Sequence, residues 1–125
     1  MSAEMMSGYR ATMFDGEAGV DWLRHGWRGL RIYARQAQAA LRTGDIARKA
    51  ELLARADRLL TLMAGILDTS AGTTLGPLLQ RIYGQLQVAL LRANSGNDAA
   101  ALDDFEQAVD RLGREMLENS QGAAA

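Results

Sequence analysis

Apolar residues recur at alternating steps of three and four in four segments of this chain, and this spacing constrains the fold more than any other feature. Such steps place apolar side chains on one face of a helix. The first stripe consists of Val20, Leu23, Trp27, Leu30, Ala34, Ala37 and Leu41. Comparable stripes predict helices at about 20–43, 46–67, 74–93 and 98–118. The single proline, Pro77, falls in the first turn of the third predicted helix, where a missing backbone N–H is tolerated.

The connections between these predicted helices are short and rich in turn residues. Gly44 suits a left-handed position after a helix, and Asp45 and Asp98 suit the N-cap of the next one. Helices of similar length joined by short connections pack antiparallel to their neighbours. We therefore expect an all-α protein, an antiparallel up-down four-helix bundle with a short N-terminal helical segment.

The chain has 125 residues, 48% of them hydrophobic, which supports one core but not two. We expect residues 1–17 to form a partly flexible N-terminal segment, residues 18–118 the bundle, and residues 119–125 a disordered tail. No uncharged run approaches the roughly 18 residues that span a bilayer, so no membrane insertion is expected. The first fourteen residues lack the basic start and apolar stretch of a signal peptide, so we expect a cytoplasmic protein.

Charge is unevenly distributed along the chain although its net value is only −1. Residues 22–58 hold nine basic and three acidic groups, net +6, whereas residues 94–125 hold two basic and seven acidic groups, net −5. Attraction between the first and last helices, which are neighbours in such a bundle, is one explanation. A basic surface for an acidic partner is the other. The near-zero total gives no overall field that would recruit nucleic acid.

The side chains offer little for catalysis or metal binding. The chain has no cysteine and one histidine, too few for a di-metal site of the bundle type. Glu17, Asp21 and His25 share one helical face and form the alternative of a metal site, against a solvated first turn favoured by the helix dipole. The glycine-rich stretch at 70–76 lacks the Gly-Lys-Ser/Thr ending of a phosphate loop. We expect no enzyme, no catalytic residues, no cofactor and no metal.

The third predicted helix is apolar on more than one face, because Tyr83, Val88, Leu90 and Leu91 lie outside its main stripe. Packing within the bundle is one explanation, and a groove for a partner helix is another.

Three glycines, Gly26, Gly29 and Gly84, fall inside predicted helices. Each costs about 1 kcal/mol relative to alanine at such a position. Close approach of neighbouring helices would explain why glycine is present there.

The same residues resemble those of the flagellin export chaperone family, FliS. The matching residues in the second half are Leu67, Asp68, Ala71, Gly72, Leu79, Tyr83, Leu90, Ala93, Asn94, Asn97 and Asp98. Looser matches are Tyr9, Trp27, Gly29, Ala37, Gly44, Asp45, Arg55 and Ala56, so the likeness covers about residues 9–118. The sequence departs from the family at Gly19 and Val20, where Ser/Thr-Pro is usual, and at Arg10, where Gln is usual.

This resemblance implies a cytoplasmic chaperone that binds the C-terminal segment of flagellin in apolar grooves. It implies that the chaperone prevents premature polymerisation and aids delivery to the flagellar type III export apparatus, without covalent chemistry or a cofactor. The partner-binding candidates are Tyr9, Ile32, Tyr33, Leu52, Leu59, Ile66, Tyr83, Val88 and Leu91. In the family the N-terminal segment can cover part of this surface, a role we assign here to Met5, Tyr9 and Met13. A self-associating bundle, a weak homodimer without flagellin binding, is the alternative.

Overall fold

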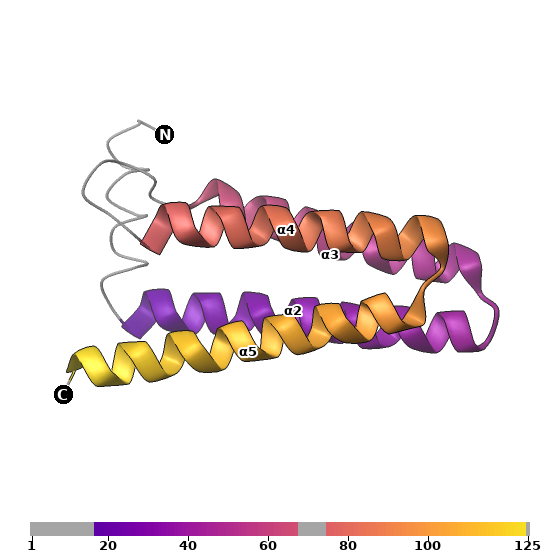
Figure 1. Cartoon of the computed structure of the whole chain (residues 1–125). Helices are drawn as coiled ribbons and strands as arrows, with labels where there is room; N and C mark the ends of the chain where they lie inside the picture. Colours follow the sequence, from indigo (N-terminus) through magenta and orange to yellow (C-terminus); the bar gives the residue numbers. More distant parts are fainter. Residues whose placement is uncertain (1–16, 68–74, 125) are drawn as a thin grey trace.

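The computed structural model describes the backbone of residues 17–67 and 75–124, and the side chains of residues 22–67 and 76–116. Its four helices are α2 (Glu17–Arg42), α3 (Ile46–Gly65), α4 (Leu75–Gly96) and α5 (Ala99–Ala124), and the described ranges contain no strand. Consecutive helices run in opposite directions (Figure 1). The expected all-α, up-down four-helix bundle is confirmed. The expected N-terminal helical segment, with Met5, Tyr9 and Met13, lies outside the described residues.

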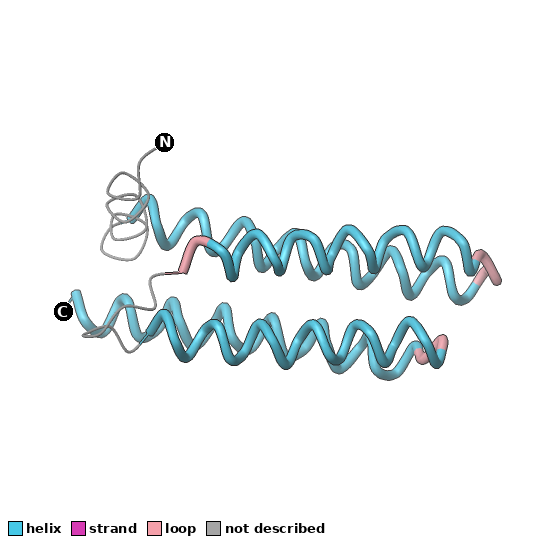
Figure 2. Tube along the Cα trace, turned by 90° about the horizontal axis from the view of Figure 1, so that it is seen from above, coloured by secondary structure: helices cyan, strands magenta, loops and turns pink. Residues whose placement is uncertain are grey.

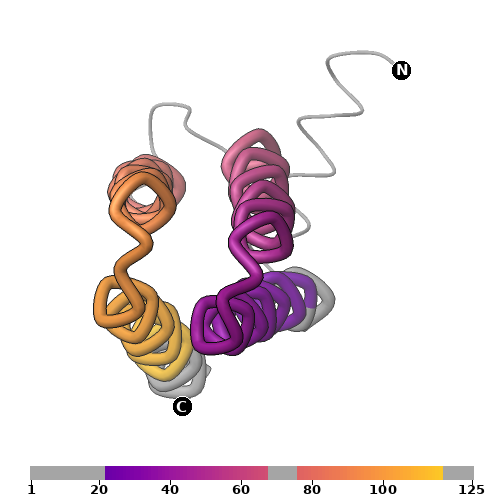
Figure 3. Tube along the Cα trace, turned by 90° about the vertical axis from the view of Figure 1, so that its right-hand side faces the viewer, coloured from indigo at the N-terminus to yellow at the C-terminus, as the bar shows by residue number. Residues whose placement is uncertain are grey.

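The four helices occupy the corners of a square when the bundle is viewed along its axis (Figure 3). α2 contacts α3 and α5, and α4 contacts the same two helices from the opposite corner. The contacts of α2 with both neighbours are more extensive than those of α4. The turns at 43–45 and 97–98 lie at the same end of the bundle (Figure 2). α4 is thus the helix least covered by the rest of the fold.

Both turns have the chemistry that their sequences predict. Gly44 adopts a left-handed backbone with φ of 78°, and the Asp45 carboxylate accepts a hydrogen bond from the Arg48 amide at 3.0 Å. In the second turn the Asp98 carboxylate accepts hydrogen bonds from the amides of Ala100 and Ala101, at 3.0 and 3.2 Å. These side chains satisfy amides that have no partner within the first turn of a helix. The caps therefore fix where α3 and α5 begin.

The bundle interior is formed by the predicted apolar stripes together with a buried pair of hydrogen-bonded aromatic side chains. The Trp27 indole N–H donates to the Tyr83 hydroxyl at 3.1 Å, and both side chains are buried. Burial raises the pKa of Tyr83 to about 12, although its hydrogen bond with Trp27 acts in the opposite direction. The other large, fully buried side chains are Leu30, Leu52, Leu60, Met63, Leu67, Leu79, Leu102, Phe105 and Val109.

Two features hold α2 tightly against its neighbours. Toward α3, a Cβ on Gly26 would lie 2.6 Å from the Met63 methyl carbon, and a Cβ on Gly29 would lie 3.1 Å from a methyl carbon of Leu59. The prediction of close helix approach is confirmed at these two glycines. Toward α5, ion pairs cross the interface, which supports mutual attraction as the explanation of the uneven charge. They join Arg31 to Asp110 at 3.1 Å and Arg31 and Arg35 to Glu106.

The helix ends differ from the predicted ones by several residues. α2 begins three residues early and α3 ends two residues early, whereas α4 continues to Gly96. α5 continues to Ala124, through most of the stretch expected to form a tail. Residues 119–124 lack large apolar side chains, but they contain no proline, and alanine is the best helix former. A helix can therefore continue here without an apolar face to mark it in the sequence.

Candidate partner-binding groove

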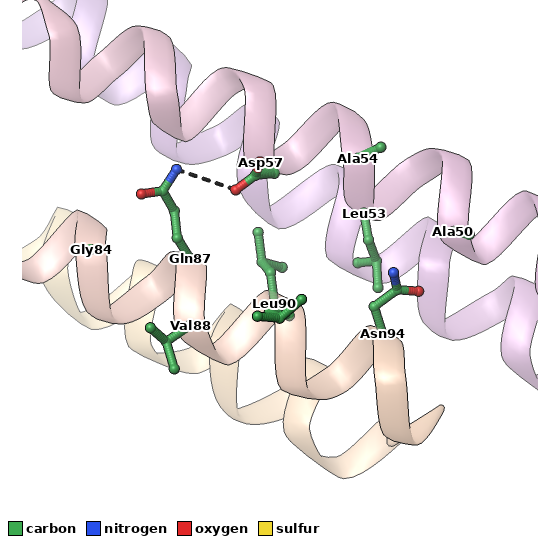
Figure 4. A pocket seen from close by; sticks show the side chains of 10 residues that line it. Ala50, Leu53, Ala54, Asp57, Gly84, Gln87, Val88, Leu90 and Asn94 are labelled. Carbon is green, nitrogen blue, oxygen red and sulfur yellow. Dashed lines mark hydrogen bonds between the residues drawn. The ribbon is translucent and has the colours of Figure 1, made fainter.

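A groove with a volume of about 460 Å³ lies between α3 and α4. Its walls come from two neighbouring helices that meet in an antiparallel pair (Figure 4). The residues from α3 are Ala50, Leu53, Ala54 and Asp57, and those from α4 are Gly84, Gln87, Val88, Leu90, Leu91 and Asn94. We call this feature the α3–α4 groove.

The floor of the α3–α4 groove is apolar and its walls carry small side chains. Leu53 and Leu90 are each 3% exposed and belong to the core below. A Cβ on Gly84 would meet nothing within 4 Å. Alanine or glycine on a helix lets another backbone approach closely, whereas leucine would hold it away. The groove has the shape and chemistry that suit the apolar stripe of a further helix.

Two exposed side chains on α4 leave apolar surface in contact with water at this groove. Val88 is 48% exposed and Leu91 is 66% exposed. Single exposed apolar residues are common on protein surfaces, but these two border one concave feature whose floor is also apolar. A partner that covers these two side chains would remove apolar surface from water, which favours binding.

Polar contacts connect the two helices near each end of the groove. The Gln87 amide nitrogen donates to the Asp57 carboxylate at 3.2 Å and to the Thr61 hydroxyl at 3.0 Å (Figure 4 shows the first). At the other end the Lys49 ammonium donates to the Asn94 backbone carbonyl at 3.0 Å and to its side-chain oxygen at 2.7 Å. Lys49 is buried, and its charge lies at the C-terminal turn of α4, where a cation is favourable. These contacts fix the spacing of the helices without filling the groove.

The candidate residues do not all lie at one place. Val88 and Leu91 line the α3–α4 groove. Ile32 is exposed on α2, while Tyr33 and Leu59 are half-buried and pack against the core. Ile66 is half-buried and follows the last residue of α3. Tyr9 lies outside the described residues.

The prediction that Leu52 and Tyr83 contact a partner is corrected by the structure, because both are core residues. Leu52 is 1% exposed and Tyr83 is 0% exposed, so neither offers surface to a partner in this conformation. The sequence pattern placed Tyr83 outside the main stripe of its helix. Its hydroxyl accepts the Trp27 hydrogen bond inside the bundle, which explains why a tyrosine is buried there.

Several groove residues were not predicted as partner contacts. Ala50 and Ala54 lie one helical turn apart on the same side of α3, and this small-residue spacing is a signal that the sequence does contain. Gly84 was predicted to mark close approach of two helices, but no other helix approaches it. Its backbone instead forms part of the groove wall. Asp57 and Gln87 gave no sequence signal beyond ordinary surface polarity.

Of the three residues of the alternative metal site, only His25 has a described side chain. His25 is exposed on α2, and no group of three His, Asp or Glu residues suited to a metal ion occurs among the side chains that the structure describes. The side chains of Glu17 and Asp21 lie outside that set. Within the described part of the chain, no helix is long and apolar enough to cross a membrane.

Comparison with known proteins relates this bundle to one family. The model of a family described as flagellar protein FliS matches residues 23–116, a range that contains α3, α4 and the groove between them. A search among curated proteins finds no match. Since the family match covers well over half of the sequence, the chain belongs to the FliS family, the family of flagellar export chaperones.

Proposed function

We propose that this protein is a cytoplasmic chaperone that binds the C-terminal segment of flagellin in the α3–α4 groove. Membership of the FliS family supports the class of function. The observation that carries the choice of site is the groove itself, an apolar depression between two helices with Val88 and Leu91 exposed at its wall. Binding prevents premature polymerisation of flagellin and aids its delivery to the flagellar export apparatus. No covalent chemistry is required of the chaperone.

A groove of this kind suits a segment that folds as it binds. A disordered segment becomes helical when its apolar side chains find a surface to cover, and part of the binding free energy offsets the cost of ordering it. Ala50, Ala54 and Gly84 leave room for the backbone of such a helix. The bound segment keeps its apolar side chains away from other flagellin molecules, which explains how binding prevents assembly.

Ile32, Tyr33, Leu59 and Ile66 remain candidates for a second contact region on α2 and α3. Among these four, Ile32 is the most exposed, at 42%, and the other three are half-buried. Leu62, which is 59% exposed on α3, adds to the apolar surface outside the groove. We propose that these residues extend the contact with flagellin beyond the groove, without forming the main site.

Isothermal calorimetry against a flagellin C-terminal peptide tests the proposal. Leu91→Gln should weaken binding about tenfold or more, because burying an exposed leucine contributes roughly 1.5–3 kcal/mol. Leu78→Gln is the matched control, since Leu78 is also an exposed leucine of α4, at 48%, but does not line the groove. The control should bind as the wild type does. Absence of heat with the wild type at high micromolar concentration would refute the function, and equal weakening by both variants would refute the site.

Self-association through the same apolar surface remains the second candidate. It predicts a dimer that persists on dilution and that Leu91→Gln dissociates, with no heat from the flagellin peptide. Light scattering over a dilution series distinguishes it from a monomeric chaperone whose groove is filled only by flagellin.

A further inference from the structure

Three exposed arginines lie one helical turn from residues that line the α3–α4 groove, without lining it themselves. On α4, Arg81 precedes Val88 by seven residues and Arg92 follows it by four, so both lie on the outer side of the Val88 wall. On α3, Arg58 follows Ala54 by four residues and lies at the opposite edge. None of these three guanidinium groups forms an ion pair with a side chain in the described part of the chain.

Four other arginines on α2 and α3 do have carboxylate partners. Arg31 and Arg35 pair with Glu106 across the interface with α5. On α3, Arg48 and Arg55 both pair with Glu51, at 3.1 and 2.6 Å. These ion pairs involve four of the nine basic residues between 22 and 58, and none of the three arginines beside the groove.

Acidic charge within the groove comes from Asp57, and its carboxylate accepts a hydrogen bond from Gln87. The apolar wall formed by Val88 and Leu91 is therefore bordered on the α4 side by the two cations Arg81 and Arg92. A partner that covers this wall must bring its own side chains close to these cations. Carboxylates match a guanidinium in both charge and geometry.

We propose that the segment bound in the α3–α4 groove is a helix whose apolar stripe is flanked by Asp or Glu, and that Arg81, Arg92 and Arg58 recognise those carboxylates. This inference rests on the proposed function and adds the charge that the flagellin segment must carry. The apolar stripe supplies most of the affinity. The flanking carboxylates fix the register and orientation of the helix, because they must meet cations at defined positions.

A second copy of this chain is a poorer occupant than an acidic segment of another protein. Helix α5 is the most acidic of the described helices, but its apolar stripe of Leu102, Phe105 and Val109 is buried in its own bundle. In a folded second copy, α5 therefore cannot offer the groove an exposed apolar stripe flanked by acidic residues.

The test reverses the charge of the two α4 arginines. Binding of the flagellin C-terminal peptide to R81E/R92E is compared with binding to R42E/R111E, which changes the net charge equally at exposed positions on α2 and α5. We expect R81E/R92E to weaken binding about tenfold, because two attractions of modest size become repulsions. We expect the control to bind within about twofold of the wild type. Thermal unfolding of both variants should stay close to that of the wild type, since the replaced side chains are exposed, with a small loss from the carboxylate that R42E places in the last turn of α2.

A charge-exchanged peptide, with every Asp and Glu replaced by Lys, provides the second arm. It should bind R81E/R92E more tightly than it binds the wild type, and raising the salt concentration should weaken wild-type binding to the native peptide. Equal affinity of the native peptide for the wild type and R81E/R92E would overturn the inference while leaving the proposed function intact. No binding to the wild type would overturn both. A wild-type dimer that R81E/R92E dissociates would show a second copy as the occupant and also overturn the inference.

Discussion

Gly84 allows the openness of the groove to be tested through stability alone. The residue lies in the interior of α4 (Leu75–Gly96), where glycine is less favourable than alanine by about 0.8–1 kcal/mol. A Cβ at this position would meet nothing within 4 Å, so no packing cost offsets the gain. We therefore expect Gly84→Ala to raise the free energy of unfolding by about 1 kcal/mol. For a chain of this size that corresponds to an increase in Tm of about 3–5 °C.

Gly26 is the matched control, because it also lies inside a helix but has no free space. A Cβ at Gly26 would lie 2.6 Å from the Met63 methyl carbon and 2.8 Å from its sulfur, and Met63 is fully buried. The same gain in helix propensity is then offset by an overpacking cost of roughly 1–3 kcal/mol. The overpacking cost minus the gain in helix propensity gives the net effect. We therefore expect the free energy of unfolding of Gly26→Ala to be unchanged or to fall by up to about 2 kcal/mol.

Urea unfolding followed by circular dichroism measures both variants against the wild type. The prediction is that Gly84→Ala is more stable than the wild type and that Gly26→Ala is not. If Gly84→Ala were destabilised, the space above it would be occupied and the groove would not be open. If both variants were equally stabilised, the close packing of α2 on α3 would be refuted.

Further predictions concern Gly84, Tyr83 and Glu106. Gly84→Leu should retain a stable fold but lose flagellin peptide binding in calorimetry, because the new side chain fills the groove; unchanged affinity would contradict this. Tyr83→Phe should lower the free energy of unfolding by about 1–3 kcal/mol, since the Trp27 N–H loses its acceptor. The pKa of Tyr83 is about 12 in the folded protein against 10.0 for an unperturbed tyrosine, so the unfolded chain loses this proton at lower pH than the folded protein does. The free energy of unfolding of the wild type should therefore fall by about 2–3 kcal/mol as pH rises from 10 to 12. Denaturant titrations of Tyr83→Phe over the same pH range should not show this loss. Glu106→Gln should lower the free energy of unfolding by about 1 kcal/mol, because it removes the ion pairs with Arg31 and Arg35. High salt should reduce this loss, and a loss that stays the same in high salt would argue against an electrostatic origin.

The bundle itself was predictable because its signals are local. Apolar steps of three and four mark the buried face of each helix, and Gly44, Asp45 and Asp98 mark where helices stop and start. The end of α5 was not predictable in the same way. No apolar periodicity runs through 119–124, and no proline there stops the helix, so the sequence marks neither a continuation nor an end.

The candidate site was harder to predict than the fold, because burial depends on which helices become neighbours. Val88 and Leu91 were identified as surplus apolar residues, and both line the groove. Tyr83 has the same appearance in the sequence, but it is buried because Trp27, 56 residues earlier, provides a hydrogen bond partner. Gly84 and Gly26 are likewise indistinguishable by residue type, although one faces open space and the other a packed methionine.

The position of the bound segment is tested most directly by nuclear magnetic resonance. Backbone amide shifts of the isotopically labelled protein are recorded while a flagellin C-terminal peptide is added. We predict that the largest changes occur at Ala50, Ala54, Gly84, Val88 and Leu91, the residues with small or exposed apolar side chains that line the α3–α4 groove. Smaller changes are expected near Ile32 and Leu62. Saturable binding with the largest changes elsewhere, and none at the groove, would contradict the account.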